Sequence, residues 1–353
     1  MKKTFLFAAI AALMTFASCT EKMDFSMEAE RVNIDVKIIS GTSATKATGY
    51  VNTTESEFQT ADEAAVQSLQ VFIFNGDARD GYAEATTFTN NEYGTTVSCT
   101  AGSRDIFCIV NAPSLADVTS KTALLAAASN LAEDSDKFEM VGSLSDQAIL
   151  SDGSSTFAVE VNRIASKIVI KNIENALTVG GRMTVRRVFI SNVAGENNYA
   201  LGAVPDVEGI WYNRGGYQSE NNLGTFTNDV ALSAEIANGE RYTTNHYFYA
   251  YPNNNVQAGY TAVWTPKRTM LVVQIEYDDK LYDYPVDLGV DLEPNKMYVI
   301  NNLKLVNLGN QDDGEEGGED EEDPITGTTA EVSVAVVDWT VVLLGNDSGE
   351  IQI

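Results

Sequence analysis

Hydrophobic and polar residues alternate with a period of two along much of the chain. The clearest run covers residues 31–39, where Val32, Ile34, Val36 and Ile38 are separated by polar side chains. Such alternation is typical of a half-buried β-strand. Similar runs bounded by Gly, Asn and Asp predict further strands over residues 65–74, 95–100, 105–111, 156–173, 183–193, 246–251, 269–277, 282–288 and 297–306.

Apolar residues at helical spacing indicate a helix only over residues 115–131. Many short strands with few helices favour β-sandwiches, and the length of the chain suits two of them. The sequence therefore predicts an all-β protein. Its N-terminal sandwich covers residues 47–162 and contains the short helix, and its C-terminal sandwich covers residues 163–353.

The first eighteen residues have the composition of an export signal. Two lysines precede an apolar run over residues 5–17, which is too short to span a bilayer as a mature helix. The run ends in FASC at residues 16–19, which resembles a bacterial lipobox. We therefore expect a signal peptide over residues 1–18 and lipid on Cys19, which would anchor the protein in the outer membrane. The alternative is an ordinary signal with an incidental cysteine.

The charge and the histidine content narrow the function. The chain has 50 acidic and 23 basic residues, a formal net charge of −27, and one histidine, His246. Binding to nucleic acid needs lysines and arginines that neutralise phosphates, so a nucleic-acid partner is not expected. A single histidine removes most metal sites and Ser/His/Asp schemes. We expect no enzyme, no cofactor and no metal. The tyrosines around His246 suggest strand packing, with a carbohydrate platform as the alternative.

An acidic segment separates the last strand from the body of the chain. Residues 311–323 contain nine acids in thirteen positions and no apolar side chain, which predicts a solvated loop. A calcium loop is the alternative, but the acids lack the spacing that such a loop requires. Beyond it, residues 330–344 (AEVSVAVVDWTVVLL) are strongly apolar.

Two cysteines, Cys99 and Cys108, lie symmetrically about an expected turn at residues 103–104. In a hairpin they would face each other, and an exported protein meets an oxidising compartment. A disulfide and a pair of reduced core cysteines both remain open.

Eight segments follow one another in a recognisable order over nearly the whole chain. They are the lipobox at Cys19, the basic loop at residues 40–47, IFCIVNAP at 106–113, VEVNRIASKIVI at 159–170, HYFYAYPN at 246–253, TPKRTMLVVQIEY at 265–277, EPNKMYVINNLKL at 293–305 and VSVAVVDWTVV at 332–342. With these segments in this order, the chain resembles the fimbrillins, the major subunits of the type V pili of Bacteroidia.

The resemblance implies two transthyretin-like β-sandwiches and a defined route of assembly. The subunit would be exported as a lipoprotein, and a trypsin-like protease would cut the loop after the first strand. Loss of that strand would open a groove for the C-terminal strand of a neighbour. The partners would be identical or related subunits and the processing protease.

The tail has the side-chain pattern that such an exchange requires. Val332, Val334 and Val336 repeat the alternation of the first strand, and Trp339 and Val341 continue the apolar run. Because the strand period is two, this match sets register and face together. Residues 330–353 would then be the donor strand. Alternatively, the tail is the last core strand of its own domain. Both interpretations are true if the tail packs in its own domain until assembly and is donated afterwards.

The cut can be placed from its consequences. Cleavage after Arg31 would leave the strand attached, whereas cleavage between Lys46 and Ala47 removes it whole. Residues 19–46 would then form a lipidated propeptide. The sequence thus predicts a stalk subunit of a cell-surface fimbrium that supports adhesion to host or bacterial surface ligands. The alternative is an adhesin or a tip or accessory subunit that binds glycan or host protein.

Overall fold

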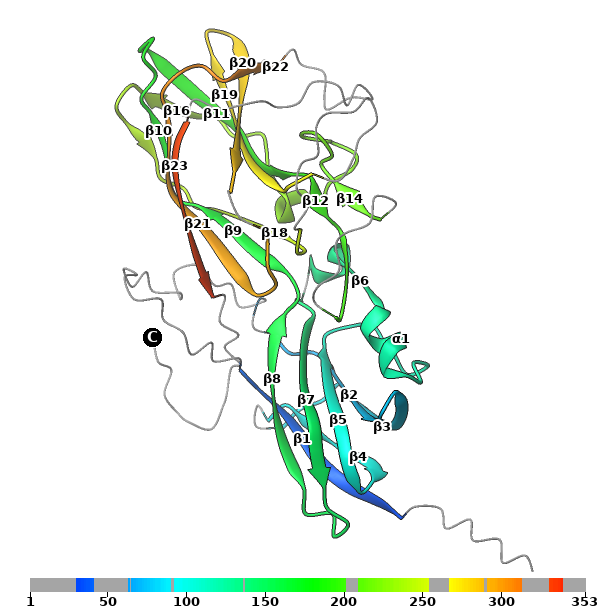
Figure 1. The fold of residues 1–353 in the computed structure, drawn as a ribbon. Coiled ribbons are helices and arrows are strands. Elements are labelled where there is room, and N and C mark those ends of the chain that lie inside the picture. Colours follow the sequence, from blue (N-terminus) through cyan, green and yellow to red (C-terminus); the bar gives the residue numbers. More distant parts are fainter. Residues whose placement is uncertain are drawn as a thin grey trace, which may run out of the picture.

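The fold is all-β, as predicted (Figure 1). In the computed structural model, the described residues are 30–40, 63, 65–89, 92–135, 137–200, 209–253, 267–288, 291–312 and 330–338. Cys19, Lys46, Ala47, Trp339 and Val341 lie outside these ranges, as do residues 313–323 of the acidic segment. The predictions that concern them stay predictions.

The first sheet has seven strands in the order β3-β2-β5-β7-β8-β1-β4. The sheet curls so that its two edge strands, β3 and β4, come together. Their closeness is shown at Gly81 of β3, where an added Cβ would lie 2.7 Å from the carbonyl oxygen of Ser98 in β4. One core cluster fills the inside of this curl. The strands are β1 (Arg31–Ser40), β2 (Leu69–Asn75), β3 (Ala78–Ala85), β4 (Gly94–Thr100), β5 (Gly102–Val110), β7 (Met140–Ile149) and β8 (Thr156–Arg163).

The second sheet has the order β17-β10-β21-β9-β18, with β23 added to β21. The chain enters it directly from the first sheet, through the fully buried Ile164 and Ala165. The division into two domains stays a prediction. The strands of this sheet are β9 (Ser166–Ile170), β10 (Ile173–Asn175), β17 (Arg241–Tyr242), β18 (His246–Ala250), β21 (Lys296–Leu305) and β23 (Ala330–Asp338).

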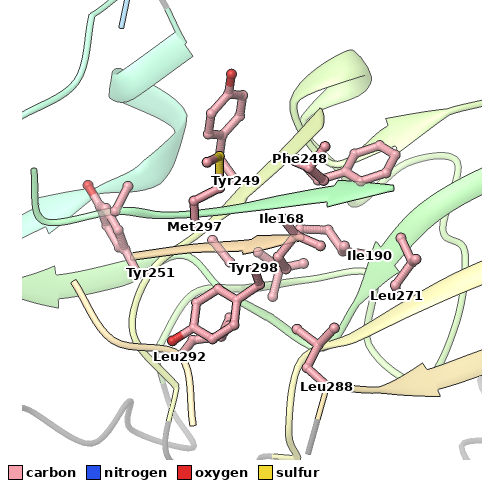
Figure 2. Close-up of a cluster of buried hydrophobic side chains, with 14 of the residues drawn as sticks. Ile168, Ile190, Phe248, Tyr249, Tyr251, Leu271, Leu288, Leu292, Met297 and Tyr298 are labelled. Atoms are coloured by element: carbon pink, nitrogen blue, oxygen red, sulfur yellow. The ribbon is translucent and has the colours of Figure 1, made fainter. Parts of the chain in front are cut away.

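The third sheet has the order β15-β11-β19-β20-β22, with β16 added to β11. Its side chains share a core with those of the second sheet, as Ile190 and Leu271 do with Ile168, Phe248 and Tyr298 (Figure 2). This arrangement is a β-sandwich. The strands are β11 (Arg182–Ser191), β15 (Asn228–Asp229), β16 (Ala234–Ala237), β19 (Met270–Tyr277), β20 (Lys280–Asp287) and β22 (Asn310–Asp312).

Short elements complete the described chain. Two-stranded sheets pair β12 with β14 and β6 with β13. The elements are α1 (Lys121–Ala126), β6 (Ala128–Asn130), η3 (Leu131–Ser135), β12 (Val193–Ala194), β13 (Glu196–Asn198), β14 (Trp211–Tyr212) and η4 (Gly224–Phe226).

The helix expected over residues 115–131 is much shorter than predicted. Ser120 caps α1 by accepting a hydrogen bond from the amide of Ala123, and the helix ends after six residues at Ala127, which is extended. The following residues pair with β13 instead. Pairing with a distant strand has therefore overridden the helical spacing.

The acidic segment does not begin as a loop. Gln311 and Asp312 belong to β22 and pair with Tyr282 and Leu281 of β20. Backbone pairing does not require apolar side chains, so composition alone placed the start of the loop two residues too early.

Candidate functional site

Strand β1 lies inside the first sheet and not at its edge. It pairs antiparallel with β4, from Arg31 opposite Thr100 to Lys37 opposite Gly94. On its other side it pairs parallel with β8, from Asp35 opposite Thr156 to Ser40 opposite Val161. The position is visible in Figure 1, where β1 is the dark blue strand. Without β1 the sheet would contain a slot with unpaired backbone groups on both walls.

The faces of β1 are those that the alternation predicted. Val32, Ile34, Val36 and Ile38 are 9%, 1%, 1% and 3% exposed, and all belong to the core cluster of the first sheet. The residues between them are exposed. Burying a branched apolar side chain contributes about 1.5–3 kcal/mol, so the slot holds its strand largely by apolar contact.

The two cysteines line this core but do not form the expected hairpin pair. Cys99 of β4 lies opposite Val32 of β1, whereas Cys108 of β5 lies between Val71 and Gly142 on its two neighbouring strands. Strands β4 and β5 are not hydrogen-bonded neighbours, because the chain crosses the curl between them. The expected pairing of the two cysteines across a hairpin is therefore wrong. Both thiols are free and buried.

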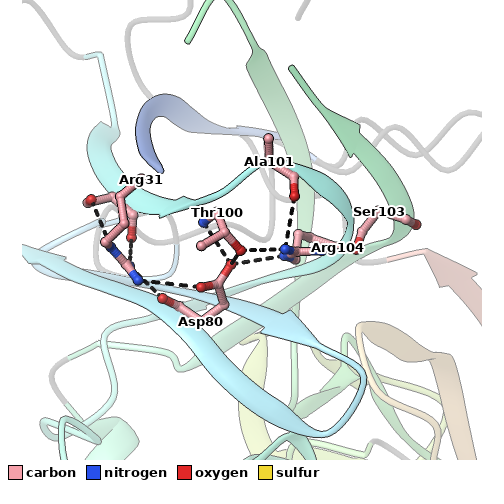
Figure 3. A network of polar contacts seen from close by, with 7 residues as sticks. Arg31, Asp80, Thr100, Ala101, Ser103 and Arg104 are labelled. Atoms are coloured by element: carbon pink, nitrogen blue, oxygen red, sulfur yellow. Dashed lines mark hydrogen bonds and ion pairs between the residues drawn. The ribbon is translucent and has the colours of Figure 1, made fainter. Parts of the chain in front are cut away.

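A polar network closes the end of the slot where β1 begins (Figure 3). The Nη2 atom of Arg31 donates to the carbonyl oxygens of Asp80 and Ser98, each at 2.6 Å. Its Nε donates to Ser98 Oγ at 3.3 Å, and its Nη1 lies 3.5 Å from Asp80 Oδ1. Arg31 thus ties β1 to both β3 and β4.

The Asp80 carboxylate is held from the other side as well. Its Oδ2 accepts from Arg104 Nε at 2.9 Å and from the amide and hydroxyl of Thr100 at 2.8 and 2.7 Å. Partial burial raises the pKa of Asp80, but the hydrogen bonds from Arg104 and Thr100 outweigh burial and hold the pKa below its usual value. The carboxylate is therefore charged at neutral pH.

A second network, which the sequence did not suggest, lies where the chain passes between sheets. The carbonyl oxygen of Glu63 accepts from Nε and Nη2 of Arg163 at 2.9 and 2.7 Å. Its Oε1 lies 2.6 Å from Lys167 Nζ and also accepts a hydrogen bond from the Tyr249 hydroxyl. The sequence held no specific signal for it, because Arg163 and Lys167 lie among other polar residues of the alternating run over residues 156–173.

This network is almost completely shielded from water. The side chains of Lys167 and Glu63 are 0% and 1% exposed. Burial lowers the pKa of Lys167, and the adjacent Glu63 carboxylate opposes that shift. Glu63 therefore fixes the chain that precedes β2 to strands β8, β9 and β18.

The tail strand β23 pairs with a strand of its own chain in this structure. It pairs antiparallel with β21, from Ala330 opposite Leu305 to Asp338 opposite Lys296. Val332, Val334 and Val336 lie opposite Leu303, Ile300 and Tyr298 in this register. Among the described strands, β23 pairs with β21 alone, so it forms a sheet edge.

Within the described residues there is neither a candidate metal site nor a helix that could span a membrane. No group of three or more His, Cys, Asp or Glu side chains within them is placed to bind a metal ion. No helix in that part of the chain is long and apolar enough to cross a membrane. His246 is buried against Asp229, with Nδ1 2.7 Å from Oδ2, which fits a structural role.

Comparison with known proteins agrees with this geometry. Residues 31–172 match the family model described as major fimbrial subunit protein (FimA), and the match begins at the first residue of β1. A search of curated proteins gave no match.

Solved structures share the fold over most of the chain. A candidate cell adhesion protein from Parabacteroides distasonis has a TM-score of 0.60 at 16% identity, and one from Bacteroides eggerthii has 0.58 at 19%. In both cases 88% of this chain and 97% of the other are covered. A fimbrilin (FimA) from Porphyromonas gingivalis has a TM-score of 0.56 at 14% identity, with 88% and 98% covered. At these identities the likeness concerns the fold. The match to the family model covers residues 31–172, and the shared fold extends over most of the chain.

Proposed function

We propose that this chain is a structural stalk subunit of a fimbrium, which polymerises when the tail strand of one copy replaces β1 of the next. It acts by assembly and not by catalysis. The observation that carries the proposal is the interior position of β1, between β4 and β8. A removed interior strand leaves two unpaired edges and an apolar trough, which another strand can fill.

The tail supplies a suitable strand. Its alternating valines match the side chains that β1 buries, and β23 occupies a sheet edge, held by pairing with one strand. A strand at an edge can leave without breaking the sheet behind it. The same strand can therefore be packed at home in a free subunit and donated in a filament.

Processing is part of this proposal. Export as a lipoprotein would place the protein on the outer membrane through Cys19, before cleavage between Lys46 and Ala47 releases residues 19–46. Arg31 is a poor site for the cut because its guanidinium is bonded to Asp80 and Ser98 and its backbone lies in a sheet. Lys46 and Ala47 follow the whole of β1 in the sequence, so a cut between them would release the complete strand.

The experiment is limited trypsin digestion of the purified protein, followed by electrophoresis without heating. We expect a ladder of multimers from the trimmed protein and none from the untrimmed protein. Deleting residues 330–353 should abolish the ladder, and Lys46→Gln should slow its appearance. The proposal is wrong if the trimmed, full-tailed protein stays monomeric, or if the tail deletion still gives the ladder.

A further inference from the structure

Arg31 is the only side chain of β1 for which hydrogen bonds to both β3 and β4 are described. Its acceptors are the carbonyl oxygens of Asp80 and Ser98, the Ser98 hydroxyl and the Asp80 carboxylate. All four belong to β3 and β4, so they stay behind when β1 leaves. The empty slot would end in a charged, preorganised receptor for a cationic side chain.

The chain's own tail cannot fill this receptor. After Lys304 the sequence contains no lysine or arginine through residue 353. In the register that aligns Val332 with Val32, the position of Arg31 is taken by Glu331, a second negative charge beside Asp80. In any other register or direction, the tail still offers no cation.

We propose that this receptor ranks the strands that occupy the slot, and that Arg31 makes the cut propeptide strand stay longer than the tail of another copy would. The inference rests on the proposed function. It adds that the match of apolar side chains alone does not decide which strand occupies the slot, because the acceptors on Asp80 and Ser98 favour the propeptide strand. The recognised partner is an extended strand with a cation just before its first inward side chain.

The exposure of the contact limits its strength. The Arg31 side chain is 49% exposed and Asp80 is 11% exposed, and the Nη1–Oδ1 separation of 3.5 Å is long for an ion pair. Exposed ion pairs contribute little to stability. The two 2.6 Å hydrogen bonds to carbonyl oxygens are the stronger part, because their acceptors are fixed by the sheet. We therefore expect an effect of about five- to tenfold on release.

The first test uses the full uncut chain and measures amide hydrogen exchange in β1. Arg31→Ala should raise exchange about five- to tenfold, and Arg31→Lys should restore part of the protection. The matched control is Lys37→Ala, which removes the same charge from the same strand. Lys37 is exposed and has no side-chain hydrogen bond within the described part of the chain. Equal exchange in the Arg31→Ala and Lys37→Ala variants would overturn the proposal.

The second test nicks the full chain after residue 46 and adds an excess of labelled peptide 330–342. Replacement of β1 should be faster in Arg31→Ala than in wild type. Asp80→Asn in the Arg31→Ala background should add little to the rate, because the side-chain contact between Arg31 and Asp80 is then already absent. Equal rates in wild type and Arg31→Ala would contradict the ranking but leave strand exchange intact. Failure of every nicked variant to accept the peptide would count against strand exchange, while the hydrogen-exchange result would still decide the role of Arg31.

Discussion

Lys167 Nζ lies 2.6 Å from Glu63 Oε1 in a site where both side chains are almost completely buried. The pair joins the segment that follows the proposed cleavage site to a strand of the second sheet. Such a pair stabilises weakly compared with apolar packing, but it is costly to break on one side.

The first prediction concerns this pair. Glu63→Gln should lower the free energy of unfolding by about 3–5 kcal/mol, because the buried Lys167 ammonium loses its carboxylate partner. Urea unfolding of the full chain measures the change. The matched control is Glu235→Gln, which breaks an ion pair with Arg182 whose two side chains are 56% and 63% exposed. That change should cost under about 1 kcal/mol. Similar losses in the two variants would contradict the structure.

The second prediction concerns the apolar face of β1. Ile34→Ala should lower the free energy of unfolding by about 2–5 kcal/mol, because it opens a cavity in a closed core. Ile34 is 1% exposed, whereas its neighbour Asn33 points outward and serves as the control in Asn33→Ala. Thermal unfolding of both variants checks the assignment of faces. Equal shifts would mean that β1 is not seated as described.

The third prediction concerns the thiols. A Cys19→Ser variant without reductant should show two reactive thiols in denaturant, from Cys99 and Cys108. In the native state they should react slowly, because both are fully buried and burial raises the pKa of both thiols. A count of zero in denaturant would show a disulfide, which the separate strand positions do not favour.

The fourth prediction concerns pH. Asp134 and Glu139 are buried close together, and Asp134 Oδ2 and Glu139 Oε1 have no hydrogen-bond partner among the described residues. Burial, with the neighbouring Glu139 charge, raises the pKa of Asp134 well above its usual value, and burial raises that of Glu139. The folded state therefore binds more protons than the unfolded state. The stabilisation from these groups is present at low pH and is lost as pH rises through the raised pKa values.

Asp134→Asn should therefore stabilise the protein at pH 8 more than at pH 4, since the amide needs no proton. Its oxygen can still accept the hydrogen bond that Asp134 Oδ1 receives from the Glu139 amide at 2.8 Å. Urea midpoints at the two pH values give the difference. The control, Asp152→Asn, alters an exposed carboxyl whose pKa is lowered by hydrogen bonds from Ser154, so no such gain is expected. A gain that does not depend on pH would argue against a titrating Asp134.

The parts of the fold that were predictable are those with local signals. The alternation at Val32 and Ile34 indicated both the strand and its buried face, because the strand period depends on nothing distant. The cysteines misled because sequence symmetry about a turn assumes a hairpin, and the chain instead crosses to another part of the sheet. The helix was overestimated because β13, which is distant in sequence, captures the residues after Ala127.

The two polar networks could not be predicted from the sequence, because they also join residues that are distant along the chain. Arg31 and Asp80 are separated by 49 positions, and Glu63 and Lys167 by 104. Nothing local marks Asp80 as the partner of Arg31, since Asp80 lies in β3, a strand that the sequence did not predict. Only the curl of the first sheet brings them together.

The anchoring of Glu63 also bears on why a cut should be needed at all. Strand β1 ends at Ser40, and Glu63 is held at the junction by Arg163 and Lys167, so in the uncut chain β1 stays covalently attached to the rest of the protein. A tethered strand competes at an effective concentration on the order of millimolar. A tail from a separate copy would have to match that concentration. Hydrolysis of one peptide bond would turn β1 from a covalently attached strand into a separate ligand that can dissociate. The tail strand of another copy would then compete with β1 on equal terms, as one separate strand against another, while the fold stays the same.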